Sequence, residues 1–320
     1  MDLVVKLISI FMTVSVLSCS KEGPERPRMA EACVSLDPGV LLTRSADPQE
    51  ETISNVNLFV FNSDGDLEER RYLDSRKNGG RIPKLRVGLL TGVEYTLAAC
   101  VNFSYEIKEI SKLEDLKAYR YHLAYPDEYR EGIPMTGMTK VTPSLQDTVV
   151  LRLERMMSKI NVRIDRNGLE SGVKLNVARI SVRHSPRSAK VFGESKAEGS
   201  GDTFAIGFMK SGREADVLNM EEAPGLSRAL SLYMMENMQG DLPDGNASCS
   251  YIQIEAEYVS DEQYSLPGEY LIYRFYLGES KGNFDIERNC LYEITVRPEG
   301  DGLTDAGWRT DRTGLANYQE

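Results

Sequence analysis

The chain has 320 residues, of which 27% are charged and 41% hydrophobic, and its formal net charge is −11. This composition is ordinary for a globular protein, and at this length two domains are expected. The acidic balance argues against nucleic acid as a partner, because phosphate binding needs clustered lysine and arginine. It argues equally against broad adhesion to an anionic lipid surface.

Residues 1–19 are predicted to form a lipoprotein signal peptide that ends in a lipidated cysteine. The apolar run at residues 7–17 is too short for a membrane span, which needs about 20 residues, but it has the length of a signal-peptide hydrophobic region. Residues 16–19 resemble the bacterial lipobox, in which the cysteine, here Cys19, carries the acyl chains. Such a lipid fixes a protein to a membrane. The alternative is a plain secretory signal with an incidental cysteine.

Residues 20–31 are charged and contain proline, which predicts a flexible tether, and folded structure is expected from residue 32. Strands are predicted at residues 32–36 and 40–43. Residues 56–61 are apolar on both faces, as in a strand buried between two layers, and residues 70–73 return as the second strand of a β-hairpin. Its turn holds Asn62, Asp64, Asp66 and Glu68, but Leu67 occupies the glycine position of a calcium loop, so we expect a turn and no metal.

Further strands are predicted at residues 84–89 and 94–101, followed by a helix over residues 110–119 with Ser111 and Glu114 as its capping box. Residues 134–143 are expected to be a loop with at most one edge strand. Residues 149–153 and 160–164 alternate in polarity, as half-buried strands do. The domain boundary is placed near Arg155, which gives an N-terminal domain at residues 32–155.

The second domain is predicted at residues 156–298, with strands at residues 173–182 and 251–258 and two more, EYLIYRFYLG and NCLYEITV, at hairpin spacing. Residues 299–320 are predicted to be a polar, glycine-rich tail. Short strands separated by turn signals indicate a mainly β fold of tandem antiparallel sandwiches with one or two short helices, and not a parallel α/β sheet.

Candidate chemistry is sparse in this sequence. Four cysteines besides Cys19 allow one disulfide in each domain, although buried thiols are the preferred interpretation; they are Cys33, Cys100, Cys249 and Cys290. The two histidines, His122 and His184, fall in different predicted domains, and no hydrolase or metal-binding motif occurs, so neither an enzyme nor a metal or cofactor is expected. Three tyrosines, Tyr270, Tyr273 and Tyr276, are expected to serve packing, with glycan or protein binding as the alternative.

Taken in order, the segments resemble the fimbrillin-like lipoproteins of Bacteroidales, a family of fimbrial subunits, anchors and tip proteins, and especially a less characterised branch of it. The resemblance covers nearly the whole mature chain and is carried by VNLFVFNSDG (56–65), YTLAACVN (95–102), IPMTG (133–137), LRLERMMSKINV (151–162), YMMENMQG (233–240), YRFYLG (273–278), FDIERNCLYEITV (284–296) and DAGWR (305–309).

This resemblance implies two transthyretin-like β-sandwiches and assembly by strand addition. In that family a lipidated precursor reaches the surface and is cut after an arginine or lysine near the first strand. The cut removes that strand and opens a groove, which a strand from another subunit then fills. Arg44, followed by Ser45, stands where the cut is expected; the alternative is an ordinary loop arginine. A bridge between Cys33 and Cys100 would keep the first strand attached after the cut.

Two departures from the family pattern predict a terminal role. The glycine-rich tail is expected to be a poor donor strand, and a chain still held by Cys19 has not lost its first strand. The expected function is therefore a tip or anchor subunit at the cell surface, with other fimbrial subunits as partners and attachment to the outer membrane through the lipid. The alternative is a lipid-anchored protein that binds glycan or a host protein and never polymerises.

Overall fold

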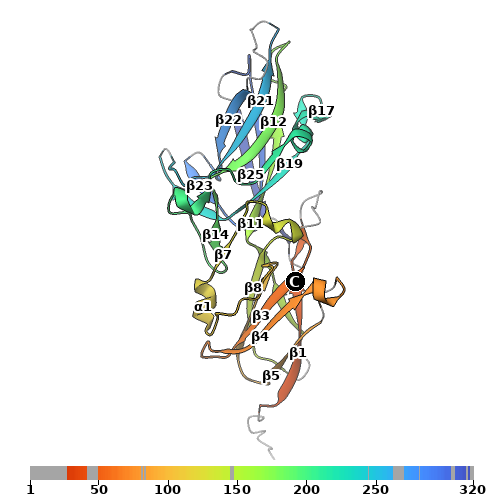
Figure 1. The fold of residues 1–320 in the computed structure, drawn as a ribbon, viewed down its shortest axis with the longest axis vertical. Coiled ribbons are helices and arrows are strands. Elements are labelled where there is room, and N and C mark those ends of the chain that lie inside the picture. The colour runs from red at the N-terminus through yellow and green to blue at the C-terminus, as the bar shows by residue number, and fades with distance from the viewer. Residues whose placement is uncertain are drawn as a thin grey trace, which may run out of the picture.

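The chain folds into two β-sandwiches that lie end to end along the long axis of the molecule (Figure 1). The computed structural model describes residues 27–41, 50–80, 82, 84–144, 148–243, 245–261, 270–280, 282–303, 307–314 and 316–317. Within these ranges no helix is long and apolar enough to cross a membrane. Most of the described chain is strand, which confirms the predicted mainly β fold.

The first sandwich packs a three-stranded sheet against a five-stranded sheet. The small sheet has the order β5–β1–β9, with β1 (Met29–Asp37), β5 (Leu85–Leu90) and β9 (Thr148–Arg152). The large sheet has the order β10–β8–β6–β3–β4, with β3 (Asn55–Phe61), β4 (Leu67–Asp74), β6 (Tyr95–Val101), β8 (Met135–Val141) and β10 (Glu154–Arg155). Apolar side chains from both sheets meet between them and form the core of this sandwich.

Strand β3 is buried on both faces, as its sequence predicts. Val56, Leu58 and Val60 face the core between the two sheets. Phe59 and Phe61 face the opposite way, into a second apolar cluster that also contains residues of the other sandwich, such as Tyr233. Apolar side chains therefore pack on both faces of the large sheet, and the cluster on the second face joins the two halves of the molecule.

The predicted hairpin is present between β3 and β4. Its turn is held by the side chain of Asn62, whose Oδ1 accepts hydrogen bonds from the backbone N–H groups of Asp64 at 3.0 Å and Asp66 at 2.9 Å. Gly65 has a φ of 81°, which glycine adopts without strain. Across the described chain, no group of histidine, cysteine or acidic side chains is arranged to hold a metal ion.

The helix after β6 is shorter than predicted, and its capping residue differs. Helix α1 (Leu113–Ala118) has 6 residues, which is less than two turns, and the side chain that bonds to the chain before the helix is Asp115 and not Glu114. The Asp115 carboxylate accepts from the N–H of Lys112 at 2.8 Å and from the hydroxyl of Ser111 at 2.9 Å. Glu114 instead pairs with Lys117 on the helix surface. The helix begins at Leu113, three residues after the start of the predicted range, and its N-cap is Lys112 and not Ser111, which moves the N3 position from Glu114 to Asp115.

The prediction of a loop at residues 134–143 is wrong, because β8 lies inside the large sheet between β6 and β10. The chain passes so close to its neighbour here that a Cβ on Gly137 would lie 2.4 Å from the carbonyl oxygen of Arg152. A glycine that looks like a turn signal therefore marks a close backbone approach inside a strand.

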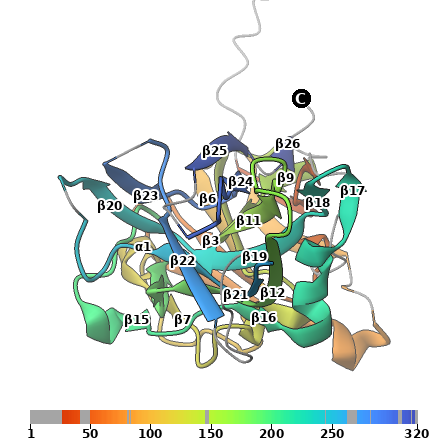
Figure 2. The same ribbon diagram turned by 90° about the horizontal axis from the view of Figure 1, so that it is seen from above.

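The second sandwich packs two four-stranded sheets. One has the order β19–β11–β24–β25, with β11 (Met157–Ile164), β19 (Leu230–Met235), β24 (Cys290–Arg297) and β25 (Gly307–Gly314). The other has the order β16–β12–β21–β22, with β12 (Lys174–Arg183), β16 (Met209–Ser211), β21 (Tyr251–Val259) and β22 (Tyr270–Tyr276). The view from above shows β12, β21 and β22 in one layer and β11, β24 and β25 in the other, higher in the picture (Figure 2).

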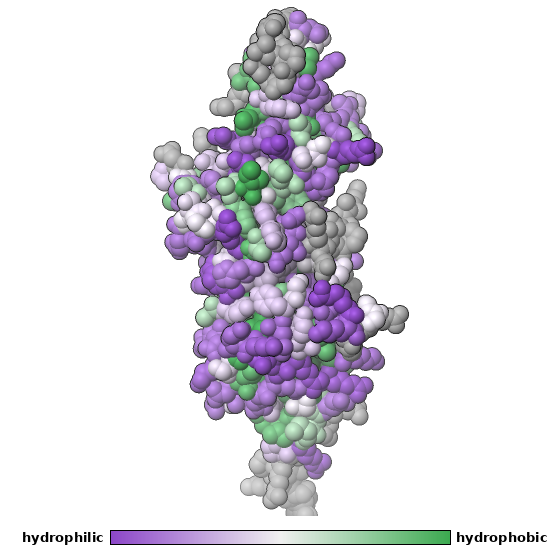
Figure 3. Space-filling view, in the orientation of Figure 1, coloured by the Kyte–Doolittle hydropathy of each residue, from purple (hydrophilic) through white to green (hydrophobic). Residues whose placement is uncertain are grey.

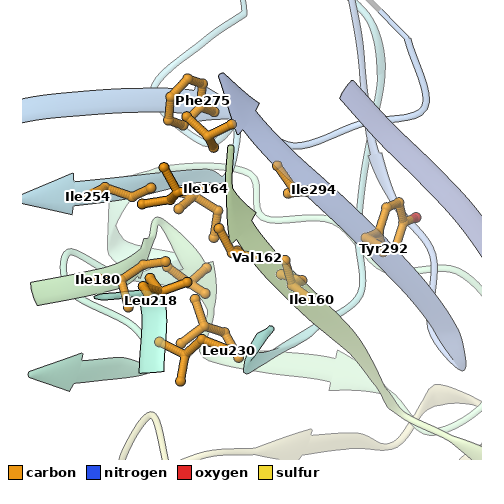
Figure 4. Packing of buried hydrophobic residues seen from close by; sticks show 14 of the residues in the cluster. Ile160, Val162, Ile164, Ile180, Leu218, Leu230, Ile254, Phe275, Tyr292 and Ile294 are labelled. Carbon is orange, nitrogen blue, oxygen red and sulfur yellow. The ribbon is translucent and has the colours of Figure 1, made fainter. Parts of the chain in front are cut away.

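Branched aliphatic side chains fill the space between these sheets. Ile160, Val162 and Ile164 project from alternate positions of β11 toward the opposite layer (Figure 4). That layer contributes Ile180 of β12 and Ile254 of β21, both buried. The alternation that the sequence shows at residues 160–164 is thus the inward face of a core strand.

Strand pairing departs from the sequence prediction in three respects. The segments predicted as a hairpin, β22 and β24, lie in different sheets. Each sandwich contains one parallel pair, β1 with β9 and β11 with β24, in an otherwise antiparallel arrangement. Residues 307–314, which the sequence placed in a polar tail, form the edge strand β25 along β24.

Short elements complete the described chain. The strands are β2 (Val40–Leu41), β7 (Arg120–His122), β13 (Ser185–Pro186), β14 (Ser188–Lys190), β15 (Thr203–Phe204), β17 (Glu221–Ala223), β18 (Leu226–Ser227), β20 (Asn237–Asp241), β23 (Asn283–Ile286) and β26 (Ala316–Asn317). The 3₁₀ helices are η2 (Ser75–Asn78), η3 (Glu128–Glu131), η4 (Ser200–Asp202) and η5 (Gly212–Asn219). The pair β7–β14 links the two sandwiches.

Candidate functional site

The first strand, β1, lies in the middle of the small sheet of the first sandwich. It pairs antiparallel with β5, from Met29 opposite Leu90 to Val34 opposite Leu85. On its other side it pairs in parallel with β9, from Cys33 opposite Thr148 to Asp37 opposite Arg152. In the described part of this sheet, β1 thus separates β5 from β9, and each of them is paired with β1.

The side chains that β1 contributes to the core are small. Ala30, Ala32 and Val34 are 6%, 1% and 5% exposed, and Leu36 is half-buried. Full burial of a valine or leucine contributes about 1.5–3 kcal/mol, and an alanine contributes less. The outward pair of Glu31 with Arg86 is exposed, so it adds little. Backbone pairing therefore carries a large share of the attachment of β1.

A hollow of about 470 Å³ lies beside the C-terminal half of β1. It forms because the pairing with β5 ends at Val34, so Ser35 and Leu36 keep a strand partner on the β9 side alone. Its lining includes Ile53, Ile82 and Lys84. On its β5 side, this part of β1 thus borders an apolar wall with one lysine at its rim.

Arg155 fastens the chain on both sides of the segment that follows β2. Its guanidinium is fully buried and donates through Nη1 to the carbonyl oxygen of Pro38 at 3.0 Å. It also donates through Nε and Nη2 to the carbonyl oxygen of Glu50, at 3.1 and 2.7 Å. One side chain at the end of the first sandwich therefore holds both Pro38, which follows β1, and Glu50, which precedes β3.

The side chain of Glu50 is held by the second sandwich. Its Oε1 lies 2.6 Å from Nζ of Lys159 in β11, and the two side chains are 0% and 1% exposed. The hydroxyl of Tyr233 in β19 donates to the same carboxylate oxygen. Sequence reasoning missed this cluster; its one signal is a lysine in β11 beside the alternating apolar residues.

Three of the predicted site residues, Cys19, Arg44 and Ser45, lie outside the described residues. The segment that holds Arg44 and Ser45 is bounded by β2 and Glu50. Arg155 and the Lys159 pair thus fix the chain on either side of the predicted cut.

Cys33, Cys100, Cys249 and Cys290 are thiols and not disulfides in the structure. Cys33 alternates with the inward Ala32 and Val34, so it points away from the core between the sheets. Cys100 belongs to the cluster on the far side of the large sheet, and burial raises the pKa of its thiol. These two cysteines are therefore on opposite outer faces of the sandwich, where a bridge cannot form.

The tyrosines and histidines named from the sequence divide between core and surface. Tyr273 points inward and donates to the carbonyl oxygen of Gly302 at 2.5 Å, whereas Tyr270 and Tyr276 are 53% and 43% exposed. His184 contacts the carbonyl oxygen of Cys249 at 3.3 Å, and His122 lies in β7. In the described part of the chain, neither imidazole is hydrogen-bonded to a serine or cysteine side chain.

Comparison with known proteins defines the class of fold. Residues 232–296 match a domain of unknown function, DUF4906. No curated protein matches the chain. Among solved structures, a putative cell adhesion protein from Bacteroides eggerthii has a TM-score of 0.61 at 13% identity, covering 92% of this chain and 98% of that one.

Two structures from Porphyromonas gingivalis are also similar. The tip fimbrial protein Mfa3, with a C-terminal truncation, has a TM-score of 0.57 at 14% identity over 90% of this chain and 100% of that one. A fimbrilin, FimA, has a TM-score of 0.56 at 14% identity over 90% of this chain and 99% of that one. The chain thus has the two-sandwich fold of fimbrilins and putative cell adhesion proteins, and the resemblance predicted from the sequence is confirmed at the level of the fold.

Proposed function

We propose that the chain is a structural subunit of cell-surface fimbriae, at the tip or the anchor end, that accepts a strand of another subunit in the place of β1. The observation that carries this proposal is the position of β1, which is the middle strand of its sheet and precedes the segment that contains Arg44. Fimbrial and tip proteins with the same fold support it.

Loss of β1 would leave a groove that only another strand can fill well. The backbone groups of β5 and β9 that now pair with β1 would face the groove without partners, and Val87 and Leu151 of the core would lose their cover. Unpaired strand edges next to an open apolar core bind strands from other chains. The small inward side chains of β1 also suit replacement, because a donor with larger residues would gain core contacts.

A single cut would make the attachment of β1 non-covalent. The chain leaves β1 through residues 38–50, and Cys33 forms no disulfide that could retain the strand. We propose the cut after Arg44, before Ser45. A chain that keeps the lipid on Cys19 remains an anchor in the outer membrane, whereas a chain cut after Arg44 becomes an acceptor near the tip. In both states the partners are other fimbrial subunits, and no cofactor is needed.

The N-terminus of the protein recovered from cells tests this proposal. A start at Ser45, together with oligomers that dissociate only on heating, supports strand exchange. A lipidated chain that starts at Cys19, stays monomeric and binds a glycan or a host protein would instead establish the non-polymerising alternative.

The replacement Arg44→Ala tests the cut directly. We expect it to block maturation and incorporation into fimbriae, measured by mass spectrometry of the N-terminus and by immunoblotting of sheared fimbriae. Arg28→Ala is the matched control, because Arg28 precedes β1 and a change there leaves the cut in place. Normal incorporation of the Arg44→Ala chain would exclude this residue as the cut site.

A further inference from the structure

The outer face of the sheet formed by β12, β21 and β22 carries an ordered set of side chains at its end nearest the first sandwich. In the strand register, Arg183, Tyr251 and Tyr276 lie side by side across the three strands. The next row is Ser181, Gln253 and Arg274. These six residues alternate with the inward core residues Val182, Ile252 and Phe275, so they share the outward face.

Aromatic rings form a continuous stripe along the first row. His184 meets Tyr251 with ring centroids 5.1 Å apart, Tyr251 meets Tyr276 at 5.6 Å, and Tyr276 meets Phe284 at 5.3 Å, each edge to face. Such contacts fix ring orientation. The backbone of His184 is held at a φ of 54°, a conformation that non-glycine residues rarely adopt and that often marks functional positions.

Two buried polar groups beside this stripe have no hydrogen-bond partner among the described residues. They are the hydroxyl of Ser181, whose residue is 0% exposed, and Nε of Arg183. A buried polar atom without a partner costs free energy, and proteins usually avoid it unless a ligand, ion or water completes the bond. The unmet donors and the aromatic stripe therefore occur at the same place.

The charge of these two rows is positive, although the whole chain is strongly acidic. Arg183 makes no ion pair within the described ranges, and Arg274 bonds to the neutral amide oxygen of Gln253 at 3.3 Å. The carboxylate of Glu255 lies one row further and is paired with Arg179 at 3.3 Å. Two guanidinium groups thus flank the aromatic stripe, and neither is paired with a carboxylate of the described ranges.

We propose that this face binds a carboxylated sugar, as in a uronate- or sialate-containing glycan. A pyranose ring stacks on the exposed ring of Tyr276, beside Tyr251, and its carboxylate is bound by Arg183 and Arg274, which supply the planar, bidentate donors that carboxylates prefer. A large protein partner fits less well, because hydrophilic and hydrophobic side chains are interspersed over this side of the molecule (Figure 3). The site uses the second sandwich alone, so it is independent of strand exchange.

The test is binding of the purified full chain to polygalacturonate and polysialic acid, with dextran as the neutral polymer, by isothermal titration calorimetry. We expect binding to at least one acidic polymer, weaker binding to dextran, and an affinity that falls as salt rises. Tyr276→Ala and Arg274→Gln should each lower the affinity about tenfold, because each replacement removes one contact with the sugar. Arg274 is exposed, so its replacement leaves the core intact.

Tyr270→Ala is the matched control, because Tyr270 lies on the same face of the same strand at its far end. The Tyr270→Ala chain should bind the acidic polymer with the same affinity as the unmodified chain. The proposal is overturned if the chain binds no acidic polymer, if it binds dextran equally well, or if Tyr270→Ala causes the same loss as Tyr276→Ala. An unchanged affinity for Arg274→Gln would also overturn it.

Discussion

Replacing Lys159 by methionine tests whether the buried pair with Glu50 joins the two sandwiches. The two charges lie 2.6 Å apart in a fully buried site, so removing the lysine leaves a buried Glu50 carboxylate that accepts from the Tyr233 hydroxyl but has lost its positive partner. Breaking a buried pair in this way costs about 3–5 kcal/mol. We expect the free energy of unfolding, measured by circular dichroism in urea, to fall by that amount.

The double replacement Glu50→Gln with Lys159→Met should recover most of this loss. Glutamine still accepts the Tyr233 hydroxyl and carries no charge, and the bonds from Arg155 go to the backbone oxygen of residue 50, which is unchanged. Replacing both members of a buried pair is often close to neutral.

Lys140→Met is the control, because its pair with Glu94 is exposed and contributes less than about 1 kcal/mol. If Lys159→Met costs no more than Lys140→Met, the pair does not hold the junction. If the double replacement costs as much as Lys159→Met and Glu50→Gln added together, the two charges are not coupled.

Two further predictions follow from side-chain environments. Iodoacetamide should modify Cys33 in the folded chain and spare Cys100 and Cys249 until urea is added, because burial raises the pKa of the Cys100 and Cys249 thiols. Mass spectrometry of the labelled peptides would show this order. Asp115→Asn should lower the melting temperature at neutral pH but not in strong acid. The hydrogen bond from Ser111 lowers the pKa of the Asp115 carboxyl below 3.8 in the folded chain. The stabilisation is therefore present above the pKa of the unfolded state and is lost as the pH falls through the pKa of the folded state. An equal deficit at both pH values would show that the carboxylate charge is not responsible.

The position of Arg155 has a consequence for maturation. Its guanidinium holds the carbonyl oxygens of Pro38 and Glu50, which flank the segment with the proposed cut. Removal of the first strand would take away Pro38 and leave the bonds to Glu50. The chain after the cut would therefore stay fixed to the junction through Arg155 and Lys159 while the groove between β5 and β9 opens.

Most strands follow from local patterns, and the exceptions have separate physical causes. Residues 56–61 were predicted as a buried strand because they are apolar on both faces, and residues 160–164 were predicted as a half-buried strand because their apolar residues recur with a period of two. Strand β8 was missed because a glycine with polar neighbours indicates a loop. The reason for Gly137 is the close approach of the Arg152 backbone, which the sequence does not show. Strand β25 was missed because its pairing comes from β24 and not from alternation of its own side chains.

The sequence by itself determined the composition of the core strands, the hairpin turn at Asn62 and the acidic, mainly β character of the chain. Only the tertiary structure decided which strands pair, that β1 lies between β5 and β9, and that Glu50 meets Lys159. These contacts join residues far apart along the chain, and their energies depend on burial and geometry that no local pattern contains. The same holds for the outer face of β12, β21 and β22, where strand register alone brings Arg183, Tyr251 and Tyr276 together.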